Sequence, residues 1–191
     1  PGDSVAVLGN GPLGILHGIM AKIQGAGMMI ATDLADRRLK MAKSFYADFT
    51  INAEKTTSKE RIQKVKDLTG GIGPDLVIEA AGEPKVFIEA LEMVRKSGTV
   101  IEVGNWVERE ETVQLNVTRH ITSKNLHIHS LYHCGHIWGP VLKVMDEYSN
   151  QFPFEKMISH KMSLEELVKN MDVVTDPNKC MKVEVIPHKK D

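Results

Sequence analysis

The sequence predicts an α/β protein built on a parallel sheet of six strands with helices on both faces. Short apolar runs rich in Val and Ile alternate along the chain with segments whose apolar residues have helical spacing. Glycine, Asn or Asp breaks separate the two kinds of segment. Strands that alternate with helices pair in parallel, and right-handed crossovers place successive helices on both faces of the sheet.

The first half of the chain gives four of these strand–helix pairs. Residues 4–8 are an apolar, β-branched run, residues 9–14 interrupt it with three glycines, and residues 13–24 continue with helical spacing. The same alternation is repeated as far as residue 94. The predicted strands are residues 4–8, 28–32, 49–52 and 75–79, and the predicted helices are residues 13–24, 35–45, 58–68 and 85–94.

Strands at residues 99–103 and 126–132 complete the predicted sheet, and the C-terminal third is less regular. A helix is expected at residues 138–148, another opens at Ser163, and residues 181–186 alternate as a terminal strand. Ser163 with Glu166 three residues later is the pattern of a capping box.

Composition excludes several classes of protein. The 191 residues include 24 Lys and Arg against 25 Asp and Glu, scattered along the chain, so nucleic acid is not the expected partner. Two cysteines are too few for a disulfide framework and fit a cytoplasmic protein. No apolar run is long enough to span a bilayer. Pro1 opens a turn into a strand, which leads us to expect a fragment of a longer chain.

The first interruption is a glycine motif. Gly9, Gly11 and Gly14 fit G-x-G-x-x-G directly after a predicted strand and at the start of a predicted helix, which is the context of a dinucleotide-binding Rossmann fold. The first glycine permits a tight turn, the second admits a pyrophosphate, and the third lets helix and strand pack closely. Pro12 suits the first helical turn, and the helix N-terminus favours phosphate.

An acidic residue follows at the spacing expected for this fold. Asp33 lies 19 residues after Gly14, at the end of the second predicted strand. Its carboxylate could accept hydrogen bonds from both hydroxyls of the adenosine ribose and would repel a 2′-phosphate, which favours NAD over NADP. Arg37 and Arg38 follow and could instead receive that phosphate. The alternative is that Asp33 only caps the next helix and the glycines only make a turn.

Further segments, beyond the glycine motif and Asp33, match one family of proteins. They are residues 1–5, 73–75, 79–82, 98–104, 126–132, 158–160, 164–166 and 181–183. With them, nearly the whole chain resembles the cofactor domain of the medium-chain dehydrogenase/reductase superfamily, which includes zinc-dependent alcohol, polyol and threonine dehydrogenases. The resemblance implies an oxidoreductase that transfers a hydride between an alcohol or polyol and NAD, with zinc in the full-length parent.

The resemblance also implies a role for each matching residue. The pyrophosphate would lie on the glycine turn, the adenosine ribose beside an acidic and a basic residue, and the nicotinamide at the ends of two later strands. The implied cofactor-binding residues are Gly9, Gly11, Pro12, Leu13 and Gly14; Asp33 and Arg38; Ala80 and Ala81; Val103, Gly104 and Asn105; Leu131 and Tyr132; and Lys182. For Lys182, a solvated lysine beside the terminal strand is the alternative.

In the family the zinc ligands and the proton relay lie mostly in an N-terminal GroES-like domain. We therefore expect no catalytic residue and no metal ligand in this chain, and no activity from it alone. Residues 1–150 would be the NAD-binding domain and residues 151–191 a helix and strand at the edge of the catalytic domain. Relatives are dimers or tetramers, so a homodimer or homotetramer is expected.

A histidine-rich stretch invites a metal hypothesis. It comprises His127, His129, His133, Cys134 and His136, and His127 and His129 share a strand face. The spacing fits no recognised metal site, so ordinary histidines are the expectation.

Two other functions remain open. One is a nucleotide-sensing module without chemistry, and the other is a zinc-free, NADPH-dependent quinone or enoyl reductase of the same superfamily. Asp33 argues against the second of these.

Overall fold

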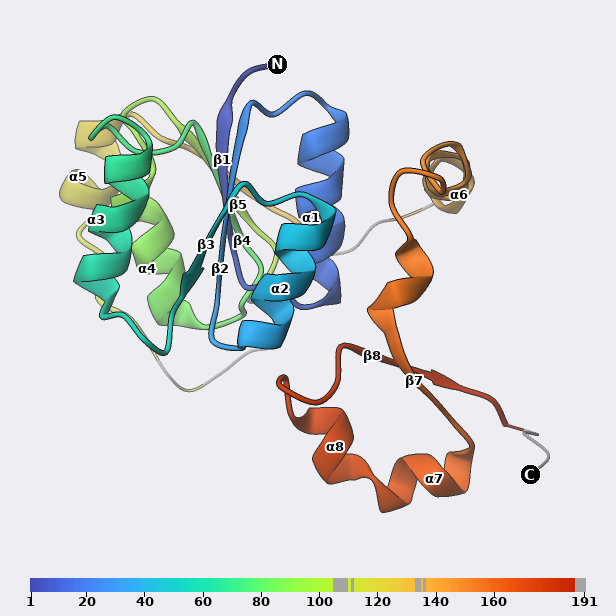
Figure 1. The fold of residues 1–191 in the computed structure, drawn as a ribbon. Coiled ribbons are helices and arrows are strands. Elements are labelled where there is room, and N and C mark those ends of the chain that lie inside the picture. The colour runs from blue at the N-terminus through green and yellow to red at the C-terminus, as the bar shows by residue number, and fades with distance from the viewer. Residues whose placement is uncertain (105–109, 111, 133–134, 136, 188–191) are drawn as a thin grey trace. The chain divides into compact units, whose positions relative to one another are not determined.

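The computed structural model describes residues 1–104, 110, 112–132, 135 and 137–187 (Figure 1). The chain forms two compact units, Pro1–His133 and Cys134–Asp191. The helix expected at residues 138–148 is therefore part of the second unit. No helix in the described ranges has the length and apolarity needed to cross a membrane.

The first unit contains the predicted six-stranded parallel sheet. Its strand order is β3-β2-β1-β4-β5-β6, and every neighbouring pair is parallel. Its elements are β1 (Ser4–Leu8), α1 (Pro12–Ile23), β2 (Met28–Asp33), α2 (Asp36–Phe45), β3 (Phe49–Asn52), α3 (Ser58–Leu68), β4 (Leu76–Glu79), α4 (Pro84–Met93), β5 (Thr99–Glu102), α5 (Val117–His120), the 3₁₀ turn η1 (Thr122–Lys124) and β6 (His127–Ser130). This is the Rossmann strand order, and it confirms the predicted fold class.

Helices cover both faces of this sheet, with α1 and α2 on one side and α3 and α4 on the other (Figure 1). The central strand β1 is consequently apolar after Ser4, and Val5, Ala6, Val7 and Leu8 are all buried. The order of the sheet reverses between β2–β1 and β1–β4, and a crevice at the carboxyl ends of these strands is where ligands bind in such folds.

The second unit has a smaller sheet of β7 and β8, which also pair in parallel. Its elements are α6 (Trp138–Glu147), the 3₁₀ turn η2 (Phe154–Met157), β7 (Ile158–Met162), α7 (Leu164–Lys169), α8 (Met171–Thr175) and β8 (Lys182–Val185). The sequence pattern missed β7, because its residues Ile-Ser-His-Lys-Met lack a clear apolar alternation. The capping box at Ser163 and Glu166 is confirmed.

Two glutamates face each other where β4 and β5 end. The parallel register pairs Glu79 with Glu102. Glu79 is fully buried, and its Oε1 accepts hydrogen bonds from the backbone N–H groups of Ala81 and Gly82, at 2.8 and 3.1 Å. Burial, and then the neighbouring Glu102 carboxylate, raise the pKa of Glu79 to about 8. We therefore expect Glu79 to hold a proton at neutral pH, and the two N–H hydrogen bonds that it accepts stabilise the turn after β4.

The protonation of Glu79 predicts how stability depends on pH. The folded chain binds a proton at Glu79 between about pH 4.5 and 8 that the unfolded chain has released. The free energy of unfolding should therefore fall as the pH rises through this interval. Glu79→Gln keeps the oxygen that accepts both N–H groups but cannot ionise. Urea unfolding at several pH values should show a smaller decline for Glu79→Gln than for the unmodified chain.

The exposed Glu54 provides the matched control. Glu54→Gln should leave the pH dependence of unfolding unchanged. An equal decline in the unmodified chain and in Glu79→Gln would show that Glu79 is ionised in the folded protein at neutral pH.

Candidate functional site

The predicted glycine motif forms the turn between β1 and α1, at the carboxyl edge of the sheet. Gly9 has φ +86°, and its N–H donates to Thr32 O at 2.8 Å. A Cβ on Gly9 would lie 2.6 Å from Ala81 Cα, and one on Gly14 would lie 1.9 Å from Gly9 O. The backbone of the loop after β4 thus touches the first turn, and α1 packs directly on it. Both glycines are required for this packing.

Gly11 has a different environment. The nearest atom to a Cβ built there is Arg38 Cζ, at 3.8 Å, so the space beside Gly11 is free of backbone. Gly11 is also the N-cap of α1, and it offers no side chain to cap the helix; Pro12 follows in the first turn and Leu13 is exposed. The helix N-terminus therefore presents backbone N–H groups and partial positive charge, as a phosphate site requires.

Asp33 ends β2 beside this turn and is buried. Its Oδ2 accepts a hydrogen bond from Asn10 N at 2.6 Å, and its Oδ1 accepts one from Ala35 N at 2.9 Å. Arg38 Nη1 is 4.0 Å from Oδ2. The two backbone donors fix the rotamer of the carboxylate. Ala35 is the N-cap of α2, so Asp33 also supports the start of that helix, as the alternative interpretation expected.

The guanidinium of Arg38 is the next group of the site. Its Nε is buried and has no hydrogen-bond partner among the residues that the structure describes. The guanidinium is 3.8 Å from a Cβ built on Gly11 and 4.0 Å from the Asp33 carboxylate, so it lies close to both. A buried donor without a partner is costly, and a bound polar group at this position would satisfy it.

The loops after β4 and β5 form the next part of the edge. Ala80 N donates to Leu8 O at 2.8 Å, which holds the loop beside the end of β1, and Ala81 is exposed next to Gly9. Val103 N donates to Glu79 O at 3.0 Å. Gly104 packs against Gly82.

The remaining predicted residues divide into three cases. Leu131 follows the edge strand β6, where its N–H donates to Glu102 O at 3.0 Å, and Leu131 and Tyr132 are both exposed. Lys182 begins β8 in the second unit and is exposed. Asn105 lies outside the described residues.

Two buried residues of this site were missed by sequence reasoning. Asn10 occupies the variable position of the glycine motif, and Tyr46 lies at the end of α2. The only signal for Asn10 was a polar residue within the motif, and no sequence pattern marked Tyr46.

The histidine-rich stretch shows no metal geometry where it can be seen. His127 and His129 are both exposed on β6, and His133, Cys134 and His136 are outside the described residues. Within the described ranges, no group of three or more His, Cys, Asp or Glu residues could hold a metal ion.

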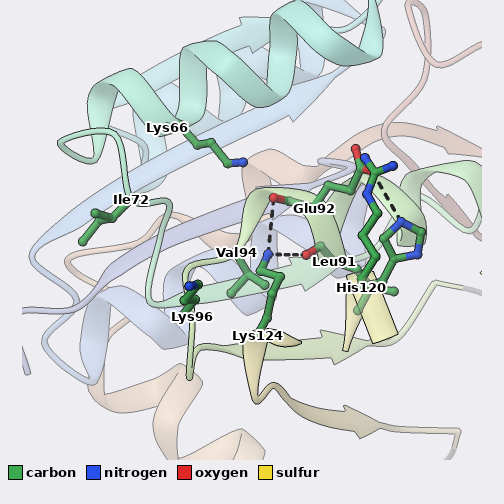
Figure 2. A pocket seen from close by; sticks show the side chains of 9 residues that line it. Lys66, Ile72, Leu91, Glu92, Val94, Lys96, His120 and Lys124 are labelled. Atoms are coloured by element: carbon green, nitrogen blue, oxygen red, sulfur yellow. Dashed lines mark hydrogen bonds and ion pairs between the residues drawn. The ribbon is translucent and has the colours of Figure 1, made fainter. Parts of the chain in front are cut away.

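A separate pocket of about 330 Å³ lies at the opposite edge of the sheet, before β5 (Figure 2). Lys66, Lys96 and Lys124 line it. Lys124 Nζ donates to Leu91 O and Glu92 O, at the C-terminus of α4. Burial, and then the nearby Lys66 charge, lower the pKa of Lys124 to about 8. The contacts of Lys124 are those of a cation that caps a helix C-terminus.

Comparison with known proteins agrees with this geometry. The chain is 31% identical over 185 residues to the erythritol/L-threitol dehydrogenase of Mycolicibacterium smegmatis, a match that covers 97% of this chain and 49% of that protein. It is 28% identical over 190 residues to the sorbitol dehydrogenase of Bacillus subtilis, covering 99% of this chain and 52% of that protein. The chain thus spans about half the length of the curated relatives it matches.

Solved structures give the same result. An alcohol dehydrogenase from Thermotoga maritima superposes with a TM-score of 0.86 at 27% identity, covering 98% of this chain and 50% of that one. Alcohol dehydrogenase TADH from Thermus sp. ATN1 superposes with a TM-score of 0.81 at 31% identity, covering 97% of this chain and 51% of that one. A family model described as zinc-binding dehydrogenase matches residues 12–148, and the chain therefore belongs to the zinc-binding dehydrogenase family, within the medium-chain dehydrogenase/reductase superfamily.

Proposed function

We propose that this chain binds NAD, in preference to NADP, at the carboxyl edge of its six-stranded sheet. We also propose that it serves an oxidoreductase that transfers a hydride between an alcohol or polyol and this cofactor. The observation that carries the proposal is the arrangement of Gly11, at the open N-terminus of α1, beside the fixed carboxylate of Asp33. The relatives whose names specify polyol and alcohol substrates support the substrate class.

The adenosine half of the cofactor has a defined place in this proposal. The pyrophosphate lies at the N-terminus of α1, where Gly9, Gly11, Pro12 and Leu13 form the turn and Gly14 allows its close packing. The ribose hydroxyls donate to Asp33. The same carboxylate repels a 2′-phosphate, because the two negative charges would share a site that is largely shielded from water.

Arg38 and the loop after β4 complete this half. The Nε of Arg38, which has no partner among the described residues, donates to the ribose or to a neighbouring phosphate oxygen. Ala80 and Ala81 line the adenine side, where their small side chains leave room for the base.

The nicotinamide end lies at the later strands. Val103 and Gly104, together with Asn105, receive the ring after β5, and Leu131 and Tyr132 do so after β6. When bound, the nicotinamide supplies the hydride acceptor or donor. In this proposal the chain orients the ring.

The described residues do not fit a zinc site, so no step of the reaction is assigned to a metal on this chain. Zinc belongs to the longer parent in this proposal, and this chain alone is inactive. We keep residues 1–150 as the proposed cofactor domain and 151–191 as the proposed edge of the catalytic part, a functional division that differs from the boundary between the compact units after His133. The parent is cytoplasmic and forms a homodimer or homotetramer, to which the exposed edge strand β6 is suited.

Equilibrium titrations followed by NADH fluorescence test the cofactor preference. The chain should bind NADH saturably and more tightly than NADPH. Asp33→Asn removes the charge at almost constant volume, so it should weaken NADH binding and reduce the preference for NADH over NADPH. Absence of saturable NADH binding, or tighter NADPH binding by the unmodified chain, would refute the proposal.

Gly11→Ala tests whether the glycine turn binds the pyrophosphate or only connects β1 to α1. A Cβ at Gly11 meets nothing closer than 3.8 Å, so the variant should unfold at the same temperature as the unmodified chain. The added methyl group takes the space of the approaching pyrophosphate, and NADH affinity should fall by about tenfold, or about 1.4 kcal/mol.

Gly139→Ala in α6 is the control for the substitution, because a Cβ there meets nothing within 4 Å. Ala favours the helix over Gly, so Gly139→Ala should not lower the unfolding temperature, and it should leave NADH affinity unchanged. Unchanged NADH affinity in Gly11→Ala would place the pyrophosphate elsewhere.

A further inference from the structure

Tyr46 is not among the predicted site residues, yet its side chain reaches the glycine turn. It follows the last residue of α2 and is 4% exposed. Its ring passes over Gly18 of α1, where a Cβ would lie 2.3 Å from the ring carbons. The missing side chain at Gly18 therefore opens the path along which the Tyr46 hydroxyl reaches Asn10.

The Asn10 side chain is completely buried, and its neighbours determine its orientation. Nδ2 donates to Val7 O at 3.3 Å and to Thr32 O at 3.0 Å, so it bridges β1 and β2. Carbonyl oxygens only accept, so the amide nitrogen must face them and Oδ1 must face the other way. Oδ1 accepts the hydrogen bond from the Tyr46 hydroxyl. Both N–H groups and the oxygen of the amide are thereby satisfied.

The backbone of Asn10 continues this connection to the ribose-binding group. Asn10 N donates to Asp33 Oδ2 at 2.6 Å. The side chain of Asn10 fixes the position of its own backbone relative to β1 and β2. The position of the N–H that holds the Asp33 carboxylate therefore depends on the amide that Tyr46 holds.

We propose that Tyr46 is a positioning residue for cofactor selection, acting through Asn10 to hold the Asp33 carboxylate against the adenosine ribose. This inference rests on the proposed function and adds a residue to it. Tyr46 and Asn10 contact no substrate or cofactor atom themselves. They set the direction in which Asp33 accepts the ribose hydroxyls, and hence how well it discriminates against a 2′-phosphate.

The Tyr46 hydroxyl remains a donor over the working pH range. Burial, and then the negative charge of Asp33, raise the pKa of Tyr46 far above its usual value. The hydroxyl therefore keeps its proton, and the contact with Asn10 does not change with pH.

Tyr46→Phe tests the proposal, because it removes the hydroxyl and leaves the ring in place over Gly18. Asn10 Oδ1 is then buried without its donor. NADH affinity should fall by about threefold to tenfold, the effect of one lost hydrogen bond. The ratio of the NADPH dissociation constant to the NADH dissociation constant should also fall. Fluorescence titrations well below the unfolding temperature of each variant measure both quantities.

A double-mutant cycle identifies the path of the effect. Asn10→Ala should weaken NADH binding and reduce the same ratio, and adding Tyr46→Phe to it should cause little further loss. Asn10→Ala also provides an independent variant if Tyr46→Phe does not fold. Tyr148→Phe, in the second unit, is the control for the substitution itself and should leave NADH binding unchanged.

The outcomes separate this inference from the function on which it rests. If the unmodified chain fails to bind NADH, the proposed function is wrong. If it binds NADH and Tyr46→Phe lowers only the unfolding temperature, with affinity and ratio unchanged, then Tyr46 has a merely structural role. Additive effects of the two substitutions would also overturn the connection through Asn10.

Discussion

The close approach of the first turn to its neighbours is the constraint on which this site depends. With no side chains at Gly9 and Gly14, the loop after β4 touches the turn and α1 packs on the Gly9 carbonyl. The same turn brings Asn10 N to Asp33. A larger residue at either glycine would separate β1 from β4 or lift the helix. The backbone N–H groups of α1 and the carboxylate at the end of β2 would then no longer share one edge.

Much of the fold could be predicted because local patterns and topology agree. Central parallel strands are buried on both faces, so runs such as Ser4–Leu8 are almost wholly apolar, and their alternation with helices leaves few possible topologies. β7 was missed because a strand in a small two-stranded sheet needs no continuous apolar run. The short helices α5 and α8 were missed for a similar reason, since a helix of one turn has no measurable periodicity.

The site could be predicted only in part. Gly11 and Asp33 were predicted from the fixed spacing of a known motif, and the structure places both at the carboxyl edge of the sheet. Tyr46 was not found, because it reaches Asn10 across 36 residues of sequence, through a gap that exists only where Gly18 packs. No sequence pattern indicated the raised pKa of Glu79, because it depends on burial at the end of β4 and on the register that places Glu102 beside it. Tertiary contacts therefore determine both the bond between Tyr46 and Asn10 and the raised pKa of Glu79.

The position of the bound dinucleotide tests the central claim most directly. A crystal structure of the chain with NADH should show pyrophosphate oxygens within hydrogen-bond distance of the backbone N–H groups at the N-terminus of α1. It should also show the adenosine ribose hydroxyls on the Asp33 carboxylate. Density for the dinucleotide in the lysine-lined pocket at the opposite edge of the sheet, with an empty glycine turn, would contradict the account.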